Sequence, residues 1–155
     1  MEDSDLWRRR YGDDTRDVVN YLSIFRNEPE TFLKLMQSDI TEIKNKGNII
    51  SQYTSRQIAD QMTFQPISVK VGEHIIPAFN FTSQQSVSGT LLSEQLGKAV
   101  LVFFIKGRSV KLSFRSRDGQ LPTALDLASI VGGGGHKNAA GGEVSLEEFI
   151  KMIVL

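Results

Sequence analysis

The sequence predicts an α/β fold with a mixed central sheet flanked by helices, preceded by a long N-terminal helical linker. Two observations predict this class. Apolar residues recur at helical spacing over residues 18–62, and from residue 64 onward short alternating strands are interleaved with helical segments. Strands that alternate with helices are typical of α/β domains. We therefore expect a linker at 1–63 and an α/β domain at 64–155.

The linker is expected to contain two helical segments. Residues 18–25 carry apolar side chains at the spacing of a short amphipathic helix. The start of a second helix is predicted next, because Asn27 can act as a helix cap and Pro29 fits a first helical turn. The apolar pattern beyond it predicts one long helix over residues 29–62, with Gly47 as a candidate break or kink.

The second half begins with an expected hairpin, in which residues 67–71 and 75–81 flank a Gly72–Glu73 turn. A helix over 87–96 and a buried strand over 99–105 follow. Two capping-box pairs then predict short helices, and these pairs are Thr123 with Asp126 and Ser145 with Glu148. The interleaving of these elements supports the α/β class.

One further strand is expected to have two chemically different faces. Val110, Leu112 and Phe114 alternate with Lys111, Ser113 and Arg115. Because successive side chains of a strand point to opposite faces, one face is apolar and the other carries basic and hydroxyl groups. Arg117 continues the same alternation and is expected on the polar face.

Composition limits the function classes. Lysine plus arginine and aspartate plus glutamate both total 18, so phosphate recognition has to be local rather than a property of net charge. The absence of cysteine excludes disulfides, thiolate nucleophiles and cysteine-ligated zinc. No apolar run approaches the ~18 residues that a membrane span requires, so we expect a cytoplasmic protein without membrane contact.

The string Gly132-Gly133-Gly134-Gly135-His136-Lys137-Asn138-Ala139-Ala140-Gly141 is the most informative stretch. Consecutive glycines destabilise regular structure by ~1 kcal/mol each, which favours a specific use. Their backbone N–H groups can surround an anion, and His136 can donate to a phosphate oxygen. We expect the small residues after His136 to let a following segment, such as a helix N-terminus, pack tightly. The alternative is a flexible linker with a solvated His136.

This string resembles the signature of the DHH-associated domain, the C-terminal substrate-binding lobe of DHH phosphoesterases. Ser113-Phe114-Arg115-Ser116 is similar to the family strand whose arginine meets substrate phosphate, and Pro77-Ala78-Phe79-Asn80 and Ser88-Gly89 are similar to flanking segments. Asp5-Leu6-Trp7 resembles the segment that follows the catalytic lobe in relatives. The resemblance implies the following substrate-binding residues: Asn80, Ser113, Arg115, Gly132, Gly133, Gly134, Gly135, His136, Ala139, Ala140 and Gly141.

The catalytic part of the family pattern is not found. The resemblance implies that aspartates and histidines of an N-terminal lobe hold manganese and activate a water. Here no Asp-His-His triplet occurs, and the two histidines are His74, beside Glu73, and His136. We therefore expect no catalytic residue, no metal ligand and no cofactor in this chain, and manganese only in an absent lobe.

Two functions of different classes remain. In the first, the chain is the substrate-binding C-terminal portion of a DHH-family phosphoesterase, binds phosphate of nucleotides or short oligonucleotides, and depends on a missing DHH lobe for hydrolysis. In the second, it is a stand-alone nucleotide or single-stranded nucleic-acid binding module. Expected partners are nucleotides or short single-stranded oligonucleotides, a separate DHH lobe and a second copy bound through the long helix. Contacts of Arg8–Arg10 with nucleic acid and of Trp7 and Tyr11 with bases are weaker alternatives.

Overall fold

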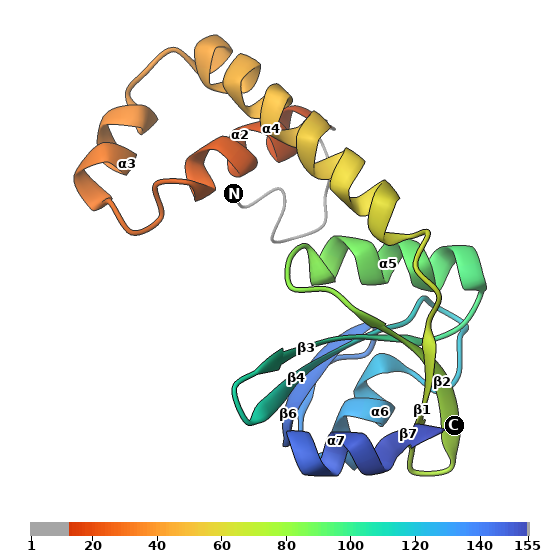
Figure 1. Ribbon diagram of the computed structural model, residues 1–155. Helices are drawn as coiled ribbons and strands as arrows, with labels where there is room; N and C mark the ends of the chain where they lie inside the picture. Colours follow the sequence, from red (N-terminus) through yellow and green to blue (C-terminus); the bar gives the residue numbers. More distant parts are fainter. Residues whose placement is uncertain (1–12, 155) are drawn as a thin grey trace. The chain divides into compact units, whose positions relative to one another are not determined.

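The computed structural model describes residues 13–154 and divides the chain into two compact units, Met1–Gln57 and Ile58–Leu155 (Figure 1). The sequence-based expectations for Asp5–Trp7, Arg8–Arg10 and Tyr11 lie outside the described residues. The division into a linker at 1–63 and a domain at 64–155 stays a prediction.

Three helices make up the described part of the first unit: α2 (Asp13–Ser23), α3 (Pro29–Met36) and α4 (Ile40–Gln61), the last of which continues into the second unit. The prediction of one helix over residues 29–62 is wrong, because the chain breaks between α3 and α4. At the break the Asp39 carboxylate accepts a hydrogen bond from the Thr41 backbone N–H at 2.8 Å, as a helix cap does. The expected cap at Asn27 is also wrong, since α3 is preceded by Glu28.

Gly47 lies inside α4 without interrupting it, so the candidate break at this residue is wrong as well. A Cβ at Gly47 would overlap the backbone carbonyl of Asp17, and the glycine therefore permits close contact between α2 and α4. The buried Asp17 carboxylate accepts a hydrogen bond from Asn48 at 3.1 Å. Burial by itself would raise the pKa of Asp17, but hydrogen bonding by Ser51 and Asn48 and the Arg16 charge lower it.

Large apolar side chains are exposed on α3 and α4, namely Leu33, Met36, Ile40, Ile49 and Tyr53. The helices therefore carry apolar surface that their own unit leaves uncovered. The dimer expected through the long helix stays a prediction.

The second unit is built on a seven-stranded mixed sheet with the order β5-β6-β4-β3-β2-β1-β7. The strands are β1 (Ile67–Val71), β2 (His74–Asn80), β3 (Val100–Lys106), β4 (Ser109–Arg115), β5 (Gly134–His136), β6 (Ala139–Ser145) and β7 (Ile153–Val154). Only β2 and β3 are parallel, and helix α5 (Gln85–Leu96) connects them. The remaining neighbours are antiparallel. The α/β class and the mixed central sheet are thus confirmed.

Helices cover both faces of this sheet (Figure 1). α6 (Ala124–Ile130) and α7 (Leu146–Met152) pack on the face that holds the larger apolar core, whose members include Leu112, Phe114 and Phe149. α5 packs on the other face over a smaller core that includes Val100 and Val102. The sheet therefore has an α6–α7 face and an α5 face.

Both predicted capping boxes are present, at Thr123 with Asp126 and at Ser145 with Glu148. In each pair the hydroxyl accepts from the backbone N–H of the acidic residue, whose carboxylate accepts in return. The hydrogen bonds of Thr123 hold the pKa of Asp126 below its ordinary value. These caps fix the first residues of α6 and α7.

The two faces predicted for β4 are also present. Val110, Leu112 and Phe114 are buried in the larger core, which leaves Lys111, Ser113 and Arg115 on the α5 face. The expectation that Arg117 shares this strand face is wrong, because β4 ends at Arg115 and Arg117 pairs with Glu94 at 3.6 Å. The polar face of β4 is therefore shorter than the sequence predicts.

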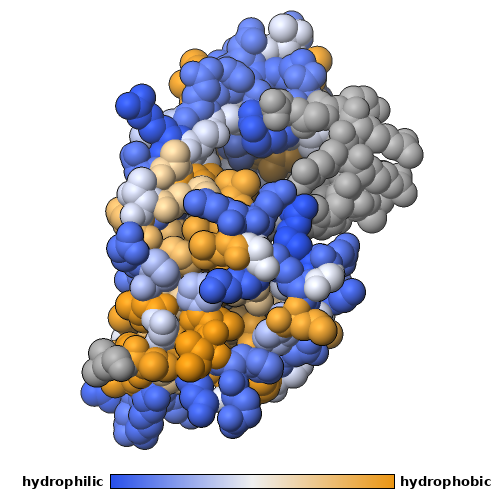
Figure 2. Space-filling view, turned by 90° about the vertical axis from the view of Figure 1, so that its right-hand side faces the viewer, coloured by the Kyte–Doolittle hydropathy of each residue, from blue (hydrophilic) through white to orange (hydrophobic). Residues whose placement is uncertain are grey.

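Figure 2 shows an apolar area in the lower half of the side that carries β1, β2 and the C-terminal strand. Exposed large hydrophobic side chains of these strands are Ile67, Ile75 and Val154. Strands β4, β5 and β6, which carry the glycine-rich string and Arg115, contribute no large exposed hydrophobic side chain to this apolar area. Within residues 13–154, no helix has the length and apolarity needed to cross a membrane.

Candidate functional site

The glycine-rich string forms the β5–β6 hairpin at one edge of the sheet. Gly134–His136 pair with Ala139–Gly141, and Lys137 and Asn138 make the turn between them. The flexible-linker alternative is therefore wrong. The expected helix start after His136 is wrong too. The small residues that follow the turn form strand β6, which pairs with β5 on one side and with β4 on the other.

Most glycines of the run are required by the fold. A Cβ at Gly133 would overlap the backbone carbonyl of Gly141, and one at Gly135 would lie 2.6 Å from the Ala140 Cα. Gly132 and Gly135 also have positive φ angles of 72° and 145°, which residues with a Cβ rarely adopt. These three glycines allow the chain to turn out of α6 and pair closely with β6.

Gly134 differs from its neighbours. A Cβ built there meets no heavy atom within 4 Å, and its φ is not in the left-handed region. The residue is exposed on β5. The fold therefore gives no reason for glycine at this position, and its bare backbone is open to a ligand.

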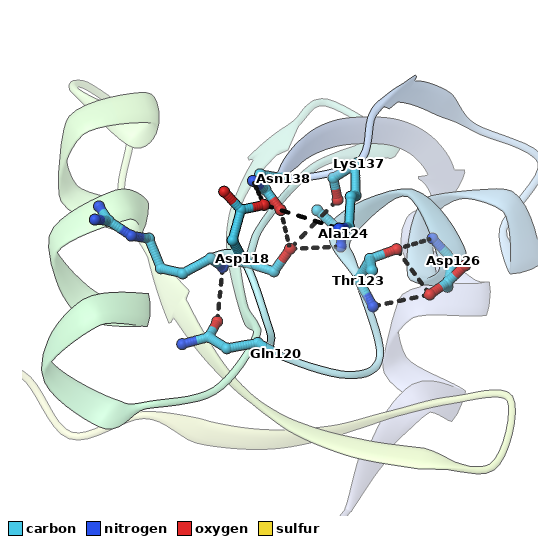
Figure 3. A network of polar contacts seen from close by, with 9 residues as sticks. Asp118, Gln120, Thr123, Ala124, Asp126, Lys137 and Asn138 are labelled. Atoms are coloured by element: carbon cyan, nitrogen blue, oxygen red, sulfur yellow. Dashed lines mark hydrogen bonds and ion pairs between the residues drawn. The ribbon is translucent and has the colours of Figure 1, made fainter.

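A polar network around Ser116, the residue after β4, fixes the turn of this hairpin. Figure 3 shows its members Ala124, Lys137 and Asn138 close to one another. The Ser116 hydroxyl accepts from the Ala124 N–H at 2.9 Å and donates to the Lys137 carbonyl at 3.3 Å. The Ser116 N–H donates to the Asn138 carbonyl at 3.1 Å, and the Asn138 amide donates to Asp118 at 2.9 Å. These hydrogen bonds tie both turn residues to the segment that follows β4, so the network sets the position of the adjoining His136 backbone.

The strand register brings predicted site residues together on the α5 face. Arg115 lies opposite Ala139, which lies opposite His136. The next row is formed in the same way by Ser113, Gly141 and Gly134. Side chains directly opposite each other in antiparallel strands point to the same face. We call these six residues the phosphate face, because the sequence predicts that they bind phosphate: Ser113, Arg115, Gly134, His136, Ala139 and Gly141.

Arg115 is the charged centre of the phosphate face. It is half-buried, and its guanidinium donates to the Phe114 carbonyl at 2.8 Å and to the Ser86 hydroxyl at 3.1 Å. Burial lowers the pKa of Arg115, although a guanidinium stays protonated at neutral pH. Within residues 13–154 it makes no ion pair, and its two neutral acceptors leave further N–H donors unused. Its charge is therefore available to an external anion.

The neighbouring cation on this face is already paired. Lys111 lies opposite Glu143, and the two form an ion pair. The hydrogen bond from Lys111 holds the pKa of Glu143 below its ordinary value. The positive charge of the β4 face therefore rests on Arg115.

Other predicted site residues lie elsewhere. Asn80 is in a row with Phe103 and Leu112, which belong to the core on the α6–α7 face. Ala140 is buried in the same core at 4% exposure. Neither residue shares the face of Arg115. Gly132, Gly133 and Gly135 are the glycines that shape the hairpin.

Sequence reasoning missed the residues that hold the site. Ser86 and the Asn138 side chain carry hydrogen bonds that no spacing pattern indicates, because their partners are distant in the chain. Ser116 was part of the resembling string but had no predicted role. Its burial to 3% exposure and its contacts with the hairpin turn now give it one.

The structural role of the run makes a prediction about stability. Gly133→Val should lower the Tm of the free protein and destabilise it by about 1–3 kcal/mol or more, because the new side chain overlaps the β6 backbone. Thermal and urea unfolding without ligand measure this effect. Gly134→Ala is the matched control and should unfold like the wild type. Equal stability of the Gly133 variant and the wild type would contradict the close packing of β5 on β6.

The sequence profile of the DHHA1 domain matches residues 77–154, half of the chain, a region that runs from the second half of β2 to the end of β7. The chain therefore belongs to the DHHA1 domain family. This is the DHH-associated domain that the glycine-histidine string resembles, and the family assignment is confirmed.

Similarity to one solved structure supports the fold. The pGpG-specific phosphodiesterase PggH from Vibrio cholerae is similar with a TM-score of 0.53 and 11% identity over 90% of this chain. The chain corresponds to 58% of the length of that protein. The C-Ala domain of alanyl-tRNA synthetase from Aquifex aeolicus has a TM-score of 0.37 and 18% identity, covering 54% of this chain and 91% of that domain. A search of curated protein sequences finds no match.

Proposed function

We propose that this chain is the substrate-binding portion of a DHH-family phosphoesterase and binds the phosphate of nucleotides or short oligonucleotides on the phosphate face. One observation carries the proposal: a half-buried Arg115 without an acidic partner among the described residues lies in one row with His136. An arginine fork that is desolvated but not neutralised is suited to phosphate oxygens.

Four residues of the phosphate face have a role in this proposal. Arg115 donates hydrogen bonds to the phosphate oxygens and supplies the balancing charge. His136 is exposed and donates from its ring, and Ser113 offers a hydroxyl from the neighbouring row. Gly134 lets the ligand approach the sheet because no side chain stands there. These residues bind and orient the phosphate rather than cleave its ester bond.

Hydrolysis is assigned to a separate DHH lobe. Among residues 13–154, no three histidine, aspartate or glutamate side chains gather into a group that could hold a metal ion. When bound in such a lobe, manganese would activate a water for attack on phosphorus. A stand-alone nucleotide or single-stranded nucleic-acid binding module is the second candidate, and it would use the same phosphate face.

The dependence of binding on phosphate tests the proposal. Isothermal titration calorimetry with 5′-AMP, pGpG and adenosine should show that both phosphorylated ligands bind and that adenosine binds at least about tenfold more weakly. The affinity for 5′-AMP should also fall as salt increases, because the contact is ionic. Equal affinities for adenosine and 5′-AMP would contradict a phosphate site.

The assignment of hydrolysis to another lobe gives a separate prediction. The purified chain should not convert pGpG or short oligoribonucleotides to mononucleotides in the presence of manganese. Chromatography of the products over several hours measures this, with an active DHH phosphoesterase as the positive control. Turnover that chelation abolishes would show that the chain has its own metal centre.

A further inference from the structure

The side chain of Arg115 lies against helix α5 at Gly89. Gly89 is buried, and a Cβ at this position would lie 2.8 Å from the Arg115 Cγ and 3.1 Å from the Val102 Cγ2. The near atom of Arg115 belongs to the stem of the side chain, not to its flexible end. A residue larger than glycine would therefore displace the stem from its place between α5 and β4.

Ser86 lies three residues before Gly89 on the same side of α5. Its hydroxyl accepts a hydrogen bond from the Arg115 Nη2 at 3.1 Å, while Nη1 donates to the Phe114 carbonyl at 2.8 Å. Gly89 thus accommodates the stem, and Ser86 and Phe114 hold the two ends of the guanidinium fork. Ser86 is exposed, so this end of the guanidinium fork lies at the surface of the protein.

We propose that Ser86 and Gly89 of α5 are positioning residues that hold the Arg115 guanidinium ready for phosphate. This inference rests on the proposed function of the phosphate face. An arginine side chain has many rotamers, and fixing it before the ligand arrives removes an entropic penalty from binding. Both acceptors are neutral, so they hold the guanidinium without cancelling its charge.

Calorimetry with 5′-AMP on the full chain tests this inference. The single variants are Ser86→Ala, Gly89→Ala and Arg115→Ala, and two double variants combine Arg115→Ala with Ser86→Ala or with Gly89→Ala. We expect Gly89→Ala to weaken binding about tenfold and Ser86→Ala about threefold, both through Arg115. In the Arg115→Ala background neither change should alter affinity further. Ser86→Thr should keep the hydroxyl and the wild-type affinity. Ser129→Ala, which removes a helical hydroxyl bonded within α6, is the matched control and should have no effect.

A second readout reports on Arg115 directly. The Arg115 Nε resonance in ¹⁵N spectra of the ligand-free chain should shift or broaden in both Ser86→Ala and Gly89→Ala, and Ser86→Thr should restore it. If Gly89→Ala does not fold, the two Ser86 variants decide the question.

The outcomes separate the inference from the function on which it rests. Unchanged 5′-AMP affinity in Arg115→Ala would overturn the phosphate face itself. Reduced 5′-AMP affinity in Arg115→Ala, together with wild-type affinity in Ser86→Ala and Gly89→Ala, would overturn only the positioning role. Losses from Ser86→Ala or Gly89→Ala that persist in the Arg115→Ala background would also overturn it, because the residues would then act independently of Arg115.

Discussion

Arg115→Ala is expected to weaken binding of 5′-AMP about tenfold or more. A charge-assisted hydrogen bond to phosphate contributes roughly 1.5–3 kcal/mol, and 1.4 kcal/mol corresponds to a tenfold change in affinity. Within the described part of the chain, the paired state of Lys111 leaves no second free cation on the β4 face to compensate. Calorimetry at fixed salt measures the loss. His136→Ala should weaken binding as well, since His136 lies in the same row.

Lys111→Ala is the matched control for this experiment. It removes a cation from the same face of β4, but one whose charge Glu143 already balances. We expect little change in affinity and a small change in Tm, because exposed ion pairs contribute little to stability. Unchanged affinity in both the Arg115 and the His136 variants would show that the phosphate lies elsewhere. Unfolding of both would mean that these residues are structural.

Gly134→Val is expected to abolish the thermal stabilisation by 5′-AMP while changing the Tm of the free protein only modestly. The fold has room for a side chain at Gly134, and a β-branched residue suits a strand. The valine side chain would occupy the open space above the sheet, in the row of Ser113 and Gly141, where the phosphate is expected to bind. A ligand that binds only the native state raises the Tm, so the lost shift reports lost binding.

The comparison has to use ligand-dependent shifts at matched, saturating 5′-AMP and matched salt. Ser68→Val, an exposed substitution on β1 near the other edge of the sheet, is the control and should keep the full shift. Gly133→Val differs in kind, because it should lower the Tm without ligand. Equal shifts in the wild type and the Gly134 variant would show that the open glycine surface does not face the ligand.

Local signals were sufficient to predict many elements of the fold. The alternation in β4 places Arg115 on the polar face whichever strands lie beside β4. The two capping boxes fix the starts of α6 and α7 through contacts between residues three apart in the sequence. The break before α4 could not be predicted from periodicity, because apolar residues continue across it. It is the local bond from the Thr41 N–H to Asp39 that interrupts the apparent single helix.

Long-range pairing explains what the sequence could not predict. Gly134 and Gly135 show no period-two pattern of apolar side chains, so β5 becomes recognisable as a strand only through its pairing with β6. The same applies to Asn80, whose face depends on the pairing of β2 with β3. Ser86 lies 29 residues from Arg115 in the chain, and only the packing of α5 on β4 reveals their contact.

An NMR titration of the ¹⁵N-labelled chain with 5′-AMP tests the phosphate face most directly. We expect the largest saturable shifts at the Gly134 and His136 backbone amides and at the Arg115 Nε. Adenosine at the same concentration should leave these resonances unshifted. His74 and Asn80, at the two ends of β2, should shift little. Saturable shifts concentrated on β1 and β2, with the β5–β6 hairpin unchanged, would contradict binding at the phosphate face.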